Sequence, residues 1–148
     1  MKKILFMLSF MIVSIFADTE FAKPVPTLEN PRQFIFPITS GDENEISHVL
    51  SSASNVIKFY GPNKCEVAIV CYSQGIKALL KKSYFFNKDI QKRVRSLMTY
   101  DVEFIACANT MRTYNIEKKE LMEDVEVVTA GIVELIERQR MDWTYIRP

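Results

Sequence analysis

Short apolar runs alternate with amphipathic segments along most of the chain. Three of these runs predict strands buried within a sheet: Gln33–Ile38, Val67–Cys71 and Val102–Cys107. The second contains no polar side chain, which is typical of a parallel strand covered on both faces. Shorter runs at Val125–Val128 and Trp143–Ile146 predict a fourth and a fifth strand.

Between the predicted strands, apolar residues recur every three or four positions, as in helices with one buried face. The predicted helices run from the cap Asp42 through Ile57, from Ser73 to Lys82, from Asn87 to Met98, from Ile116 to Met122 after the cap Asn115, and from Ile132 to Arg140. This alternation predicts an α/β fold with a mainly parallel sheet and right-handed crossovers. We expect the common strand order 2-1-3-4, in which the first strand separates the second from the third.

The first seventeen residues predict a secretory signal peptide. Lys2 and Lys3 precede the uncharged run Ile4–Phe16, and the small residue Ala17 follows it. The run is shorter than the ~20 residues that a membrane-spanning helix needs. An uncleaved anchor remains the alternative, because Ile15 is bulky for a position near a cleavage site.

The predicted mature chain has two parts. Residues 18–32 contain three prolines and are expected to form an extended lead-in, and residues 33–148 form the α/β domain. Secretion across the inner membrane would place this domain in the periplasm, and no further membrane span is expected there.

Composition excludes several functional classes. The chain has 148 residues, with 19 Lys and Arg against 18 Asp and Glu, so no global positive charge favours nucleic-acid binding. A single histidine, His48, argues against the commonest zinc sites. The loop Thr39–Glu43 has one glycine and two acidic residues, unlike a phosphate-binding loop. We therefore expect neither a metal nor a cofactor.

The main candidate site is the segment Cys107–Arg112, which follows the third predicted strand. In open α/β sheets, ligands bind beyond the C-terminal ends of the strands. If Asn109 or Thr110 opens a helical turn, free N–H groups would favour a thiolate at Cys107, and so would Arg112 if it folds back. Such a thiolate can act as a nucleophile or carry a persulfide. The alternative is a buried structural cysteine.

A second candidate is Cys71-Tyr72-Ser73-Gln74-Gly75, which imitates the nucleophile elbow of serine hydrolases. Cys71 replaces the first glycine of that motif, and the only histidine precedes the serine. We therefore expect Ser73 to cap a helix and not to act as a nucleophile.

The three cysteines are not expected to form an intramolecular disulfide. With the first strand between them, Cys71 and Cys107 would lie ~10 Å apart, beyond the ~7 Å limit between Cα atoms. Cys65 and Cys71 would be separated by nearly ~20 Å of extended strand. The sequence assigns no role to Cys65 or Cys71.

Val102–Arg112 resembles the core motif of DsrE/DsrF-like proteins, the family of intracellular sulfur oxidation proteins. The resemblance continues through Asp124–Val128, Ala130–Ile132 and Trp143–Pro148, and covers about Phe34 to Pro148. It implies a three-layer, flavodoxin-like sandwich with about five strands, assembled as a trimer or hexamer.

Family members pass sulfane sulfur as a cysteine persulfide. The resemblance implies a sulfur carrier or sulfurtransferase in which Cys107 is the catalytic cysteine, with a sulfur donor or acceptor protein as partner. Asn109 and Thr110 match the neighbours of the motif cysteine, and with Arg112 they are the predicted substrate-binding residues. Tyr72-Ser73 stand where branch members often carry His-Gly. A non-catalytic oligomeric module that binds a small ligand or partner is the alternative function.

Overall fold

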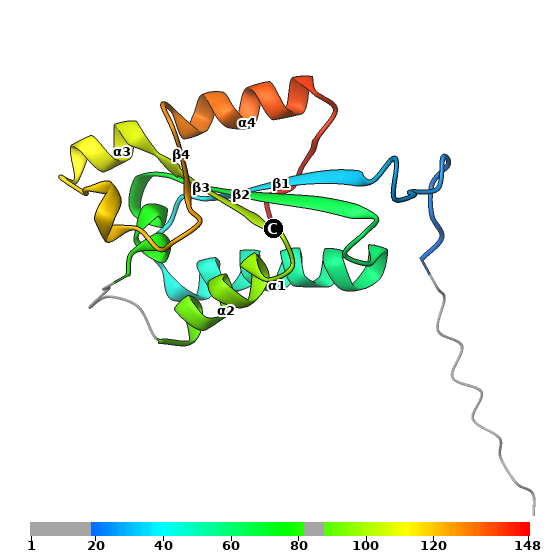
Figure 1. The fold of residues 1–148 in the computed structure, drawn as a ribbon, viewed down its shortest axis with the longest axis horizontal. Coiled ribbons are helices and arrows are strands. Elements are labelled where there is room, and N and C mark those ends of the chain that lie inside the picture. The colour runs from blue at the N-terminus through cyan, green and yellow to red at the C-terminus, as the bar shows by residue number, and fades with distance from the viewer. Residues whose placement is uncertain (1–18, 82–87) are drawn as a thin grey trace, which may run out of the picture.

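The fold is a three-layer α/β sandwich around a five-stranded, all-parallel sheet in the order β4-β3-β2-β1-β5 (Figure 1). The computed structural model describes residues 19–81 and 88–148. The strands are β1 (Arg32–Ile38), β2 (Cys65–Cys71), β3 (Glu103–Cys107), β4 (Glu126–Val128) and β5 (Thr144–Tyr145). The α-helices are α1 (Glu43–Tyr60), α2 (Lys88–Met98), α3 (Ala108–Thr113) and α4 (Gly131–Arg140), with 3₁₀ helices η1 (Ser73–Leu79) and η2 (Lys118–Glu120). The predicted fold class is confirmed.

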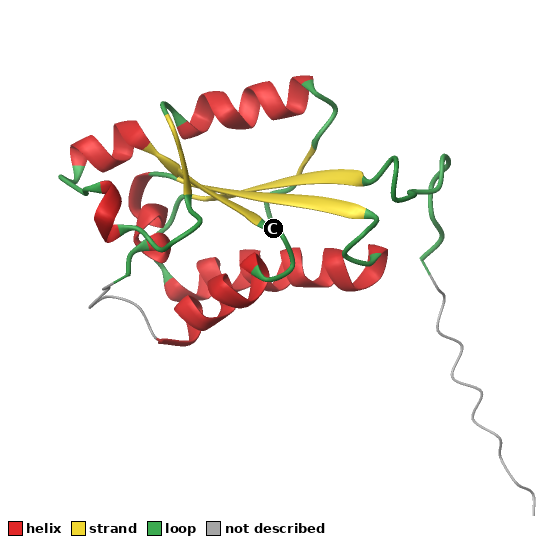
Figure 2. Cartoon of the chain, viewed as in Figure 1, coloured by secondary structure: helices red, strands yellow, loops and turns green. Residues whose placement is uncertain are grey.

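Helices cover both faces of the sheet, α1 and α2 on one side and α4 on the other (Figure 2). Alternation along the strands divides the core in two. On β2, Ile69 packs into the larger core with α1 and α2, whereas Val70 packs into the smaller core beneath α4. This two-sided burial explains why the central strand has no polar side chain over Val67–Cys71.

The predicted strand order is wrong, because β2 and not β1 lies next to β3. Pro37 offers a physical reason. It has no N–H to donate, and its side of β1 faces β5, as Ile35 shows by accepting a hydrogen bond from Ile146 N–H. The two residues of β5 pair only with Phe34 and Ile35, so Pro37 lies beyond them and no ladder bond is lost. If β1 lay between two long strands, Pro37 would cost the sheet one ladder hydrogen bond.

Two predicted helices are shorter and tighter in the structure. The segment predicted from Ser73 to Lys82 is the 3₁₀ helix η1, which ends at Leu79; Lys82 lies outside the described residues. Only glycine fits at position 75 of this helix, because a Cβ built there would lie 2.1 Å from the Ile38 carbonyl oxygen. The backbone is therefore held against the end of β1, and its N–H binds the Thr39 carbonyl.

The segment predicted from Ile116 to Met122 contains only η2, capped by Glu117 and not by Asn115. Glu117 and Glu120 form a reciprocal capping box. The helix that was predicted to begin at Asn87 is α2, and Asn87 itself lies outside the described residues.

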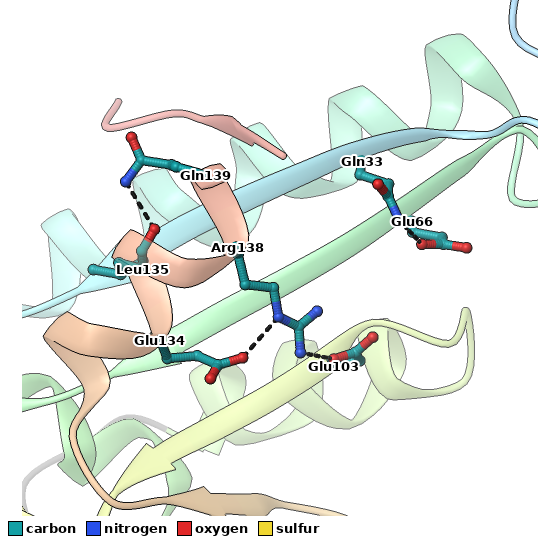
Figure 3. A network of polar contacts seen from close by, with 7 residues as sticks. All are labelled: Gln33, Glu66, Glu103, Glu134, Leu135, Arg138 and Gln139. Carbon is teal, nitrogen blue, oxygen red and sulfur yellow. Dashed lines mark hydrogen bonds and ion pairs between the residues drawn. The ribbon is translucent and has the colours of Figure 1, made fainter. Parts of the chain in front are cut away.

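Arg138 fastens α4 to the sheet (Figure 3). Its side chain is only 14% exposed and donates to Glu103 on β3 at 2.6 Å and to Glu134 at 2.7 Å. The guanidinium also lies 4.4 Å from the ring centroid of Trp143. These contacts hold α4 over β3, the strand that ends at Cys107.

The lead-in, described from residue 19 onward, joins β1 at the N-terminal ends of the strands, opposite to the ends where Cys107 lies. Phe21 packs against Phe59 and Tyr60 of α1, and Arg32 donates to the carbonyls of Ala22 and Pro24. The predicted signal peptide, residues 1–17, lies outside the described residues. Within residues 19–81 and 88–148, no helix is both long and apolar enough to cross a membrane.

Candidate functional site

Cys107 lies where β3 ends and α3 begins, on the face of the sheet that α4 covers. It pairs with Val128 on β4 and is 5% exposed. The first residue of α4, Gly131, packs directly against it: a Cβ built on Gly131 would lie 3.3 Å from Cys107 Cβ and 3.1 Å from a Val70 methyl. A glycine at this position lets the start of α4 approach the sulfur closely.

Cys107 caps α3 with its sulfur, because the N–H of Thr110 donates to Sγ at 3.5 Å. Hydrogen bonding from the Thr110 side chain and from the backbone N–H groups of Gly131 and Asn109 also acts on the pKa of the thiol. Burial acts to raise the pKa of the Cys107 thiol, but these hydrogen bonds outweigh burial and lower the pKa below its ordinary value. The site therefore favours a thiolate.

Thr110 is itself held by a residue from the neighbouring strand. Its Oγ1 accepts a hydrogen bond from the Ser73 N–H at 3.1 Å. Thr110 thus connects the turn after β2 with the sulfur at the end of β3.

The other two predicted site residues lie at the exposed rim. Arg112 donates to the side-chain oxygen of Asn109, so these two side chains bind each other. The donors that lower the pKa of Cys107 do not include the Arg112 guanidinium. Asn109 acts on the sulfur through its backbone N–H, and substrate binding by either side chain stays a prediction.

Tyr72 and Arg147 were not among the predicted site residues, yet both act near Cys107. Burial, then Tyr145 and Cys107, raise the pKa of the Tyr72 phenol, whereas the positive charge of Arg147 acts to lower it. Tyr72 is thus within electrostatic reach of both the Cys107 sulfur and the C-terminal arginine. The sequence held one signal for Tyr72. It directly follows β2, as Ala108 follows β3, and neighbouring parallel strands end at the same edge of a sheet, so residues after the two strands lie close together.

All three cysteines are free thiols. Cys71 lies opposite Ala106 on the adjacent strand, and its side chain points into the α1–α2 core, whereas Cys107 faces α4. The two thiols are separated by the sheet and not by an intervening strand, which corrects the predicted reason. Burial raises the pKa of both Cys71 and Cys65, so neither favours a thiolate.

A hollow of about 430 Å³ borders the Cys107 site. It is lined by Val127, Val128, Thr129, Ala130, Val133 and Glu134, from β4 and the start of α4. The Thr129 carbonyl accepts the Asn109 N–H at 3.2 Å, which connects this wall to the cysteine loop. Among the described residues, no group of three or more His, Cys, Asp or Glu side chains could hold a metal ion.

Residues 33–148 match the DsrE/DsrF-like family. The chain belongs to the DsrE/DsrF-like family. This family is associated in general with sulfur relay. Comparison with curated proteins finds no match.

Two solved structures resemble this DsrE/DsrF-like chain. A protein of unknown function from Methanobacterium thermoautotrophicum, MTH1491, is 29% identical, with a TM-score of 0.71 over 79% of this chain and 99% of that one. The ychN protein of E. coli is 16% identical, with a TM-score of 0.64 over 77% of this chain and 96% of that one, and shows the shared fold.

The first two turns of α4 in this DsrE/DsrF-like domain expose three apolar side chains. Ile132, Val133 and Ile136 are 53%, 50% and 48% exposed. A contiguous exposed apolar patch is typical of an interaction surface. The trimer or hexamer that the family resemblance implies stays a prediction.

Proposed function

We propose that this DsrE/DsrF-like protein is a sulfur carrier in which Cys107 forms a persulfide. One observation carries the proposal: the Cys107 sulfur caps α3, where it accepts the Thr110 N–H, and hydrogen bonding there lowers the pKa of its thiol. A thiolate is the form of cysteine that attacks sulfur. The family's general association with sulfur relay supports this chemistry.

The proposed step transfers one sulfur atom. The Cys107 thiolate attacks the outer sulfur of a donor persulfide, R–S–SH, and a new S–S bond forms on Cys107. The S–S bond of the donor breaks, and R–S⁻ leaves with the electron pair of that bond. The proton stays on the transferred sulfur, so the step needs no oxidant or reductant. Reversal on an acceptor thiolate delivers the sulfur.

The surroundings of Cys107 restrict the donor. With the side chain only 5% exposed, the reacting sulfur must come on a small molecule or at the end of an extended segment of a partner protein. We propose the hollow between β4 and α4 as the route of approach, because it is lined by Val128, which pairs with Cys107.

We further propose that the protein acts in the periplasm. The support is the N-terminal pattern of Lys2, Lys3 and the apolar run to Phe16. Expression of the full chain in a Gram-negative host, followed by mass analysis of the periplasmic fraction, is expected to find a chain that begins at Asp18. Retention of the full-length chain in the membrane would overturn this localisation.

Intact-mass analysis tests the carrier function. After incubation with a small-molecule persulfide, the wild type is expected to gain the mass of one sulfur atom, which a reductant removes. Cys107→Ser should gain none. Cys65→Ser is the matched control and should behave like the wild type. Equal uptake by Cys107→Ser, or none by the wild type, would end the proposal.

A non-catalytic binding module is the second candidate function, and the low exposure of Cys107 favours it. In such a module the cysteine is a packing residue that alkylating reagents reach only after unfolding. Rapid alkylation of Cys107 in the native protein would exclude this candidate.

A further inference from the structure

Ser73 has an unusual backbone conformation for a residue other than glycine. Its φ angle is 53°, in the left-handed region. This conformation is unfavourable for a residue other than glycine unless its surroundings compensate for it. The Ser73 side chain is exposed, and its hydroxyl makes no hydrogen bond to any residue within 19–81 or 88–148. The side chain therefore does not explain the conformation.

Backbone contacts on both sides of Ser73 explain it better. The N–H of Tyr72 binds the Ile38 carbonyl at 3.1 Å, and the N–H of Gly75 binds the Thr39 carbonyl at 3.1 Å. Both neighbours are thus attached to the end of β1. Between them, the Ser73 N–H points to the other side, toward β3 and α3, and donates to Thr110 Oγ1 at 3.1 Å.

This contact holds Thr110, the residue that donates to the Cys107 sulfur. A hydroxyl oxygen can accept a hydrogen bond, and Thr110 Oγ1 accepts the Ser73 N–H at 3.1 Å. The N–H of the same threonine donates to Sγ at 3.5 Å, and its side chain also acts to lower the pKa of the Cys107 thiol.

We infer that Ser73 is a positioning residue of the Cys107 site, whose left-handed backbone directs its N–H to Thr110 Oγ1 and so holds Thr110 in place to donate to the sulfur. The inference deepens the proposed function because it concerns the same sulfur. It makes the Ser73 hydroxyl dispensable and the conformation essential. In a serine hydrolase the requirement would be the reverse, since the hydroxyl is the nucleophile.

The pH dependence of native Cys107 alkylation tests the inference, with labelling assigned to Cys107 by peptide mass. Ser73→Gly keeps the N–H and adopts the left-handed conformation without strain, so the wild-type profile should persist. Ser73→Val disfavours that conformation, and the profile should move up by about one pH unit, as for loss of one hydrogen bond to a charged group. Thr110→Val should produce a similar shift, and Thr110→Ser should restore the wild-type profile.

A double mutant separates positioning from a general structural effect. In the Thr110→Val background, Ser73→Val should cause no further shift, because the Thr110 oxygen that the Ser73 N–H binds is gone. A further, additive shift would overturn the inference. So would a Ser73→Gly profile that moves as far as that of Ser73→Val, because the hydroxyl would then be the active group.

Amide hydrogen exchange provides a second measurement that does not depend on the folding of Ser73→Val. The Ser73 amide should exchange at least about tenfold faster in Thr110→Val than in the wild type, as expected for a lost hydrogen bond of ~1.4 kcal/mol. Equal exchange would refute the contact. Persulfide formation is scored separately: a normal set of pH profiles with no sulfur uptake overturns the carrier function and leaves the positioning role standing.

Discussion

Gly131→Ala is predicted to raise the pKa of Cys107 while leaving the fold intact. The added methyl group would lie 3.1 Å from a Val70 methyl and 3.3 Å from the Cβ atoms of Cys107 and Tyr72. These contacts are a few tenths of an ångström too short, so the start of α4 must move outward. The Gly131 N–H then retreats from the sulfur.

The size of the effect follows from the hydrogen bond that is weakened. A hydrogen bond to a charged group contributes roughly 1.5–3 kcal/mol, and 1.36 kcal/mol corresponds to one pKa unit, so partial loss should raise the pKa by about one unit. Alanine favours helix over glycine by up to about 1 kcal/mol, which offsets part of the steric cost to stability.

Two measurements separate these effects: the pH profile of native Cys107 alkylation, and the free energy of unfolding from urea titration. Ile132→Ala is the matched control, because it alters the same turn of α4 on its exposed side and should leave the profile unchanged. An unchanged profile for Gly131→Ala, in a variant that folds normally, would refute the role of the Gly131 N–H.

Three further predictions concern stability and assembly. The folded protein lowers the pKa of Cys107, so the thiolate should stabilise the fold. The free energy of unfolding of the wild type relative to Cys107→Ser should be largest above the pKa of an unfolded thiol, about 8.5, and should fall as the pH drops through the folded pKa. Urea titrations at several pH values would show a flat difference if the thiolate is not stabilised. Arg138→Met removes the ion pairs of a largely buried guanidinium with Glu103 and Glu134, so calorimetry should show a loss of about 2 kcal/mol, and a loss near zero would contradict the anchoring role of this side chain. Sedimentation velocity should show a trimer or hexamer that Ile136→Lys, with a charge on the exposed apolar face of α4, shifts toward the monomer; a monomeric wild type would contradict the assembly.

Local patterns predicted the strands and helices well where one face or both faces are buried. The run Val67–Cys71 is apolar throughout because α1 and α4 cover opposite faces of β2, and this burial is visible in the sequence itself. Strand order was not visible in the same way. It depends on which long strands can pair without loss, and the position of Pro37 relative to a two-residue β5 appears only in the folded sheet.

The candidate site was predicted in part. The position of Cys107 at the end of a strand could be read from the apolar run before it and from the family motif after it. The residues that act on its sulfur could not be predicted in this way. The pairing of β2 with β3 brings Ser73 to Thr110, and the packing of α4 brings Gly131 to Cys107. The charged residue that sequence proximity suggested, Arg112, is engaged by Asn109 instead.

The stabilised thiolate is tested most directly by the rate of alkylation of Cys107 in the native wild-type protein as a function of pH, with each labelled peptide identified by mass. We expect that Cys107 alone is labelled, with a rate midpoint below the value of about 8.5 for an ordinary thiol. Cys65 and Cys71 should react only after unfolding, because burial raises the pKa of each. A Cys107 midpoint at or above that of a free thiol, or labelling of Cys107 only in the unfolded chain, would contradict a stabilised thiolate at the end of β3.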